Sequence, residues 1–146
     1  MKEIIIISKS LPATLDSLSE LREFAKESAH AAGIDEARTY KLLLAVDEMA
    51  TNVILHGYKG PRPVESITIG SEVSNGELTV TLKDSAPAFD PRTRVLPDAQ
   101  DLSRPLDERA IGGLGIYLAM SNVDRFDYRH EDGRNINLFV LKVSPT

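Results

Sequence analysis

The chain has 146 residues, 42% of them hydrophobic and 27% charged, which is the composition of a folded domain with enough apolar material for one core. This composition excludes a disordered or fibrous protein, and because a fold of this length buries roughly 70% of the surface of its unfolded chain, it needs neither a metal nor a disulfide to be stable. A net charge of -5 without a basic cluster argues against direct binding to nucleic acid, and the absence of cysteine excludes thiol nucleophiles and disulfides.

The first half of the chain predicts one strand and then two helices. Residues 2–8 contain four consecutive isoleucines, which favour a buried strand. Apolar residues recur at helical spacing over residues 15–32, and Gly33 can end that helix. Asp35 can cap a second helix that runs to about residue 56.

The second half predicts two hairpins separated by a long loop and a third helix. Residues 65–74 and 77–84 alternate around Asn75-Gly76, the strongest short sequence signal for a hairpin. A helix fits residues 114–122, and residues 123–130 and 135–143 predict a final hairpin through residues 131–133. We therefore expect one domain over residues 1–146. No segment is long and apolar enough to enter a membrane, so we expect a cytoplasmic protein.

The loop at residues 85–111 contains four prolines and shows little periodicity. Loops of this length in compact domains are usually functional or disordered. The loop is therefore either a lid over a site or a plain disordered insertion, and its flanking residues have to decide between these.

Two polar residues on the second predicted helix share a sector. Projection at 100° per residue places Glu48 and Asn52 within about 40° of each other, bordered by apolar residues, and directs Asp47 and Thr51 outward. The pair would then face a partly enclosed space, where it could supply a proton acceptor and a neutral oxygen ligand for a hydrated cation. The alternative is an ordinary surface pair along a helix.

Two further features flank the long loop. Gly112-Gly113-Leu114-Gly115 comes just before the third helix, where free backbone N–H groups and the positive end of the helix dipole can bind an anion. Asp84 ends a strand, where it could accept a hydrogen bond from an exocyclic amine. Taken alone, the glycines also fit a hinge and Asp84 also fits a turn cap.

Together, these three motifs resemble the N box and the two glycine boxes of the Bergerat-fold ATPases, a superfamily that includes gyrase, heat-shock chaperones and histidine kinases. Within it, residues 47–58 and 112–118 most resemble the small anti-sigma-factor serine kinases of bacterial partner-switching systems. Three motifs in the correct order are more specific than any one of them. The resemblance implies an α+β, two-layer sandwich with a mixed, mostly antiparallel sheet that three helices cover on one face.

The resemblance also implies a function and residue roles. The chain would bind ATP and Mg²⁺, phosphorylate a serine of an anti-anti-sigma antagonist protein and sequester a sigma factor; such kinases are commonly homodimers. Asn52 would hold Mg²⁺, Glu48 would act as general base and Asp84 would bind the adenine amine. The other implied nucleotide contacts are Ala86, Ala88, Arg109, Gly112, Gly113, Leu114, Gly115 and Asn135.

Three positions depart from the family pattern. Ala86 and Ala88 stand where the first glycine box usually has glycine or another small residue, and Asn135 stands where a hydroxyl residue is common. The altered glycine box favours an alternative function, a non-catalytic nucleotide-binding or nucleotide-free switch module on the same fold. A detached histidine-kinase catalytic domain is a weaker alternative, because no dimerising phosphoacceptor helix fits before the first strand.

Overall fold

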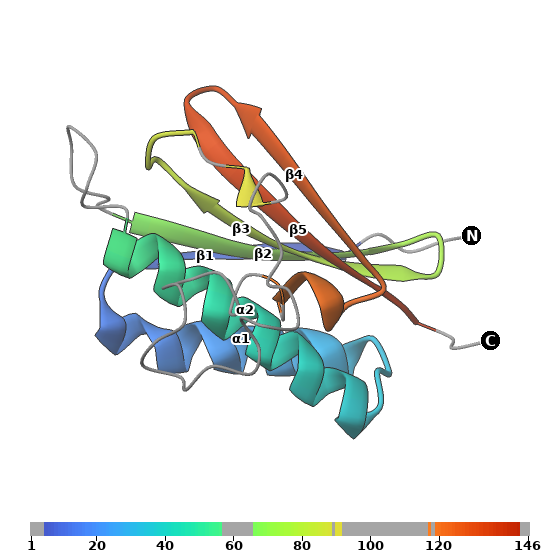
Figure 1. The fold of residues 1–146 in the computed structure, drawn as a ribbon. Coiled ribbons are helices and arrows are strands. Elements are labelled where there is room, and N and C mark those ends of the chain that lie inside the picture. The colour runs from blue at the N-terminus through green and yellow to red at the C-terminus, as the bar shows by residue number, and fades with distance from the viewer. Residues whose placement is uncertain (1–4, 57–65, 89, 92–116, 118, 144–146) are drawn as a thin grey trace, which may run out of the picture.

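The computed structural model describes residues 5–56, 66–88, 90–91, 117 and 119–143, which form two layers (Figure 1). Tyr117 and residues 119–121 are helical, inside the third helix predicted at residues 114–122, of which residues 114–116 and 118 lie outside the described part. In chain order, the elements are β1 (Ile5–Pro12), the 3-10 helix η1 (Leu15–Ser17), α1 (Leu18–Ala31), α2 (Glu36–His56), β2 (Ser66–Ser74), β3 (Glu77–Asp84), β4 (Arg125–Glu131) and β5 (Arg134–Lys142).

The strands form one sheet in the order β1-β2-β3-β5-β4. All four pairings are antiparallel, so within the described residues the sheet is antiparallel throughout, whereas the sequence predicted a mixed, mostly antiparallel one. β5 follows β4 in the chain but lies between β3 and β4. This order places Asp84, at the end of β3, directly opposite Asn135, near the start of β5.

Both predicted hairpins are confirmed, and both have two-residue turns. Asn75 and Gly76 have φ values of 54° and 75°, and Asp132 and Gly133 have 54° and 74°. Positive φ at both central residues is the type I′ geometry that matches strand twist, and Asn-Gly and Asp-Gly are the pairs that adopt it most readily. These turns fix the register of β2 with β3 and of β4 with β5.

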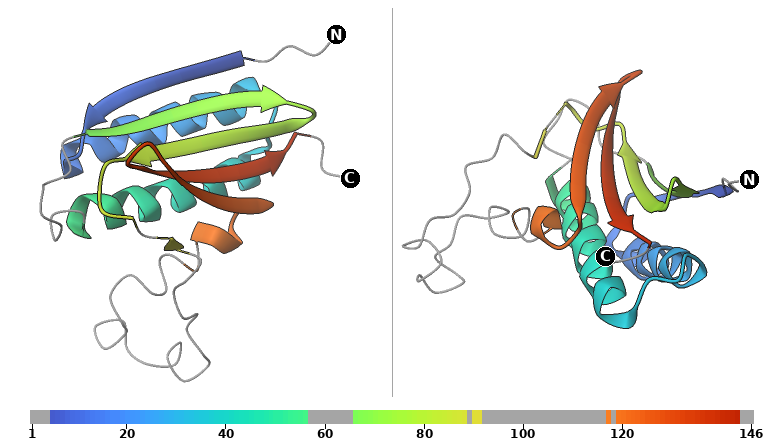
Figure 2. Two further views of the ribbon diagram at one scale, coloured as in Figure 1. Left: turned by 90° about the horizontal axis from the view of Figure 1, so that it is seen from above. Right: turned by 90° about the vertical axis from the view of Figure 1, so that its right-hand side faces the viewer.

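The helices α1 and α2 cover one face of the sheet (Figures 1 and 2). Alternation along β3 turns every second residue toward them, so that four of its eight residues are buried. Burying each large aliphatic side chain contributes about 1.5–3 kcal/mol, and the apolar stripe predicted on α2 supplies the helical side of this core. The core includes Leu21, Leu42, Val46, Met49, Ile67, Ile69, Leu78, Val80, Leu82, Phe139 and Leu141.

The start of α2 follows from local chemistry. The backbone N–H of Arg38 donates to Asp35 Oδ1 at 2.8 Å, which satisfies one of the free amides of the first turn. Gly33 has φ 81°, a left-handed conformation that glycine adopts without strain after a helix. The predicted cap and the predicted stop of the preceding helix are therefore confirmed. Within the described residues, neither long helix has the length and hydropathy needed to cross a membrane.

The first strand extends further along the chain than predicted. β1 continues to Pro12 because it pairs with β2 in a register that runs from Ile5 opposite Val73 to Pro12 opposite Ser66. The sequence predicted an end at residue 8, because Lys9 and Ser10 interrupt the apolar run. Ser10 instead hydrogen-bonds across the sheet to Thr68 at 2.8 Å, so a polar pair takes part in the strand.

Candidate functional site

The site is centred on Asp84, whose side chain is only 3% exposed at the end of β3. Its Oδ1 atom accepts hydrogen bonds from the backbone N–H of Ala86 at 2.9 Å and from Asn135 Nδ2 at 3.0 Å. Its Oδ2 atom is buried and has no hydrogen-bond donor within the described ranges. Asp84 is thus both a turn cap, through one oxygen, and a buried acceptor, through the other.

Asn135 holds the chain segment that follows Asp84. Its Nδ2 group also lies within hydrogen-bond distance of the carbonyl oxygens of Ala86, at 3.0 Å, and Pro87, at 3.2 Å. Its Oδ1 atom accepts a hydrogen bond from the hydroxyl of Tyr128 on β4. A network across β4, β5 and β3 therefore fixes one face of the Asp84 carboxylate.

Burial changes the acidity of this carboxylate. Desolvation raises the pKa of Asp84, because the charged form loses the water that would stabilise it. The hydrogen bonds from Asn135 and Ala86, and the nearby His130, act in the opposite direction but do not cancel the effect. A ligand that donates a hydrogen bond to Oδ2 would relieve part of the cost of burying this group.

Asn52 lies on α2 and is half-buried, as predicted. Its Oδ1 atom is buried and has no hydrogen-bond partner among the residues described. A neutral amide oxygen suits a hard cation such as Mg²⁺, which typically takes few protein ligands and completes its shell with phosphate and water oxygens. The described residues contain no group of three or more His, Cys, Asp or Glu side chains able to hold a metal without such help. The residues present therefore fit a cation that arrives with a phosphorylated ligand.

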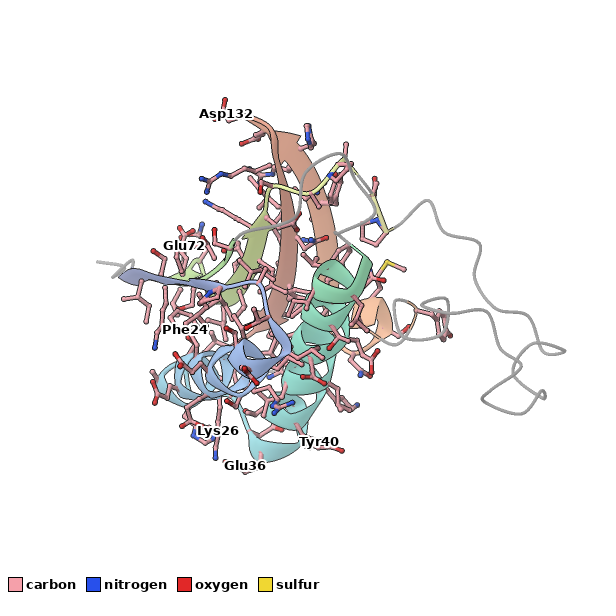
Figure 3. The ribbon with its side chains drawn as sticks, turned by 90° about the vertical axis from the view of Figure 1, so that its left-hand side faces the viewer. Phe24, Lys26, Glu36, Tyr40, Glu72 and Asp132 are labelled. Atoms are coloured by element: carbon pink, nitrogen blue, oxygen red, sulfur yellow. The ribbon has the colours of Figure 1, made fainter. Side chains whose placement is uncertain are left out.

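The expected enclosure of Glu48 is wrong, because its side chain is exposed. The projection assigned the wrong residues to the outward sector of α2. Asp47 is partly buried and pairs with Arg22 of α1 at 2.8 Å, whereas Leu44 is 38% exposed. Figure 3 shows Tyr40, also exposed, toward the start of the same helix. The side of α2 that carries Glu48 is therefore its open side within the described residues.

The residues that replace the first glycine box differ from each other in their surroundings. Ala86 is partly buried and packs against the hydrophobic core, whereas Ala88 is exposed. Most of the predicted lid, together with Arg109 and the Gly112, Gly113, Leu114 and Gly115 motif, lies outside the described residues. Of the predicted site residues, the structure thus brings together Asp84, Asn135 and Ala86.

Sequence reasoning missed two residues of this region. Tyr128 binds Asn135, and Asn137 lies two positions further along β5, only 3% exposed, with its Oδ1 unpaired among the residues described. Asn137 was detectable as a polar residue between Ile136 and Leu138 at a core-facing position of a strand. Tyr128 had no comparable signal, because its role depends on the register of β4 with β5.

Residues 11–140 match the family of the histidine kinase-like ATPase domain. The chain belongs to this family. Its α+β fold agrees with the Bergerat ATP-binding fold expected from the three motifs.

The chain is also similar to individual proteins of known name. It is 26% identical to a protein named serine-protein kinase RsbW from Bacillus cereus over 133 residues, which cover 89% of this chain and 81% of the relative. An RsbW of Listeria monocytogenes is 28% identical over 131 residues, covering 89% and 83%. The fold also resembles a crystal structure of the RsbU and RsbW domains of a Mycobacterium tuberculosis protein, with a TM-score of 0.64 and 16% identity. That match covers 97% of this chain and only 33% of the other.

Proposed function

We propose that this protein is an ATP-dependent protein serine kinase and anti-sigma factor, which phosphorylates an anti-anti-sigma antagonist protein and sequesters a sigma factor. The observation that carries the proposal is the buried Oδ2 of Asp84, an acceptor without a donor among the described residues, at the strand end where this ATPase family is expected to bind its base. The names of the RsbW relatives support the choice of a serine as phosphoryl acceptor.

In the proposed site, Asp84 Oδ2 accepts a hydrogen bond from the exocyclic amine of adenine. Asn135 and the Ala86 amide hold the carboxylate so that only this oxygen faces the base. Asn135 thus acts as a positioning residue, which differs from the nucleotide contact expected from the sequence. Ala88 and Arg109 are proposed to contact the nucleotide from the lid, and the segment that follows the lid is proposed to contact it through Gly112, Gly113, Leu114 and Gly115.

In the proposed reaction, Glu48 would accept the proton of the substrate serine while the serine oxygen bonds to the γ-phosphorus of ATP, and ADP would leave with the bridging oxygen. Asn52 Oδ1 would hold Mg²⁺, which would neutralise charge at the phosphates, the main requirement of phosphoryl transfer. The exposure of Glu48 favours a protein substrate, because a serine on the surface of another protein can reach an open carboxylate. We further propose that the protein acts in the cytoplasm, where a sigma factor is found.

The alternative remains a non-catalytic switch module. Ala86, which packs against the core, favours it, because its methyl group adds bulk at a position where the first glycine box usually has glycine. Both functions include partner binding, but only the kinase transfers a phosphoryl group.

The proposal is tested by thermal unfolding of the purified protein with ATP or ADP, each with and without Mg²⁺. For a Kd of about 10 µM, ~1 mM nucleotide adds roughly 2.7 kcal/mol, which raises the Tm by about 5–10 °C. We expect the larger shift with Mg²⁺, and expect Asn52→Ala to lose the difference between the two conditions. An unchanged Tm in all four conditions would contradict ATP binding, whereas a shift without transfer to any antagonist protein would favour the switch module.

A further inference from the structure

Two buried oxygens at the same end of the sheet have no donor among the described residues. They are Asp84 Oδ2 and Asn137 Oδ1, and both side chains are 3% exposed. Asn137 is not part of the network that joins Tyr128, Asn135 and Asp84. The hydrogen bonds of that network therefore do not explain why Asn137 is buried.

The strand register places these two residues near each other. Asp84 is opposite Asn135, and Asn137 is opposite Leu82, two residues back along β3. Alternation puts Asn137 on the same face of β5 as Asn135, the face that carries Phe139 and Leu141 into the core. Asn137 is thus a diagonal neighbour of Asp84, a relation that corresponds to about 7–8 Å between strand positions.

An unpaired acceptor at such a position is costly to the folded protein. Buried polar groups are nearly always hydrogen-bonded, and one that lacks a partner destabilises the fold, because it has lost its hydrogen bonds to water. Two such acceptors close together would be satisfied by a ligand that presents N–H donors to both of them. A carbonyl group at the same place would face two oxygens and could not bond to either.

We propose that Asn137 is a second base-recognition residue, whose Oδ1 acts with Asp84 Oδ2 to select a 6-aminopurine. This inference rests on the proposed nucleotide-binding function. The exocyclic amine of adenine carries two N–H groups, so Asp84 accepts one, and Asn137 accepts the other directly or through a water molecule held between them. Purines with a 6-oxo group, such as those of ITP and GTP, present an acceptor at that position in place of the two donors of the amine.

The test compares Asn137→Leu with Ser28→Ala. Leucine is close to asparagine in size but has no polar atom. Ser28 on α1 is the matched control, because its buried hydroxyl also lacks a partner among the described residues and lies outside the proposed site. Calorimetric titration with Mg-ATP and with Mg-ITP measures base selection, and the Tm without nucleotide measures stability.

We expect Asn137→Leu to weaken ATP binding by about tenfold, the loss of one hydrogen bond, while ITP binding changes by less than about twofold. Both variants should keep or raise the Tm of the unliganded protein, because each removes an unpaired buried polar atom. Ser28→Ala should bind both nucleotides as the unmodified protein does.

Two results would overturn the inference alone: ATP binding by Asn137→Leu that equals that of Ser28→Ala, or a fall in the unliganded Tm of Asn137→Leu, which would assign Asn137 a partner inside the protein. Failure of the unmodified protein to bind either nucleotide would instead overturn the proposed function, and this inference with it. A second variant, Asn137→Thr, suits a strand and keeps a hydroxyl acceptor, so it should lose part of the ATP affinity and none of the ITP affinity.

Discussion

The carboxylate of Asp84 has two oxygens in unlike surroundings. Oδ1 is held by Asn135 and the Ala86 amide, while Oδ2 is buried without a donor among the described residues. A residue that served only as a turn cap would normally leave its second oxygen in water. Burial of this carboxylate raises the pKa of Asp84 through desolvation, and residues with a perturbed pKa cluster at functional sites.

Glu48 allows a test of catalysis apart from binding. Glu48→Gln keeps the size of the side chain but removes its ability to accept a proton, so we expect ATP affinity to be retained and phosphoryl transfer to fall by about 10²–10⁴-fold. Transfer of labelled phosphate from ATP to a purified anti-anti-sigma protein measures the effect.

The matched control for this variant is Glu36→Gln. Glu36 is an exposed carboxylate at the start of the same helix (Figure 3), where it pairs with His30 at 2.9 Å. Glu36→Gln should leave phosphoryl transfer unchanged, since Glu36 lies outside the proposed site. Equal transfer by the two variants would remove Glu48 as the base.

At the scale of the element, α2 carries both Glu48 and Asn52, so the placement of this helix fixes the relation between the proposed base and the proposed cation ligand. Its buried residues, such as Val46 and Met49, pack into the core, and Asp47 ties it to α1 through Arg22. These contacts fix which side of α2 faces the core. Its beginning is fixed by the hydrogen bond from the Arg38 amide to Asp35.

Removal of this cap should loosen α2 measurably. Asp35→Ala leaves an amide of the first turn without its acceptor, which costs about 1 kcal/mol and lowers the Tm by roughly 2–5 °C. Asp35→Asn keeps an acceptor at the cap and should stay close to the unmodified protein. Thermal unfolding followed by circular dichroism compares the two, and equal losses would show that the carboxylate acts through its charge and not as a cap.

At the scale of the whole molecule, one cluster joins the helical layer to the sheet. Arg38 Nη2 on α2 donates to Asp124 Oδ2 at 2.7 Å and to the Lys142 carbonyl oxygen at 2.6 Å. Asp124 Oδ2 also accepts the Lys142 backbone N–H at 2.8 Å. The start of α2, the residue before β4 and the end of β5 therefore meet at one carboxylate.

This cluster predicts a dependence of stability on pH. The Lys142 backbone N–H, helped by Arg38, holds the pKa of Asp124 below its usual value of 3.8. A lowered pKa in the folded state stabilises the fold above about pH 3.8, and this contribution is lost as the pH falls through the lowered pKa. We therefore expect Asp124→Asn to be less stable than the unmodified protein near neutral pH, and the difference to shrink in acid. Urea unfolding at several pH values measures it, and a difference that did not change with pH would contradict an electrostatic role.

Much of the fold could be predicted from the sequence, because its determinants are local. The Asn75-Gly76 turn, the Asp35 cap and the apolar stripe of α2 each act within a few residues and appear where expected. The end of β1 was not predictable in this way. It depends on pairing with β2, more than fifty residues away in the chain, as the hydrogen bond between Ser10 and Thr68 shows.

The candidate site was likewise predictable only where its determinants are local in the sequence. Asp84 was found from its place at a strand end, but its partnership with Asn135 spans 51 residues and requires knowledge that β5 lies beside β3. The exposure of Glu48 was missed, since a helical projection gives relative directions only. Which sector faces α1 is set by tertiary contacts such as that of Asp47 with Arg22.

The position of β5 in the sheet bears on how the protein is made. β5 is the last of the five strands to leave the ribosome, yet it lies in the interior of the sheet between β3 and β4. Until it emerges, β3 is an unprotected edge, β4 has no neighbour, and Asp84 lacks Asn135. Nascent chains that end before residue 134 thus carry an open strand edge that can pair with other chains. The site around Asp84 is completed only when synthesis of the domain is almost finished.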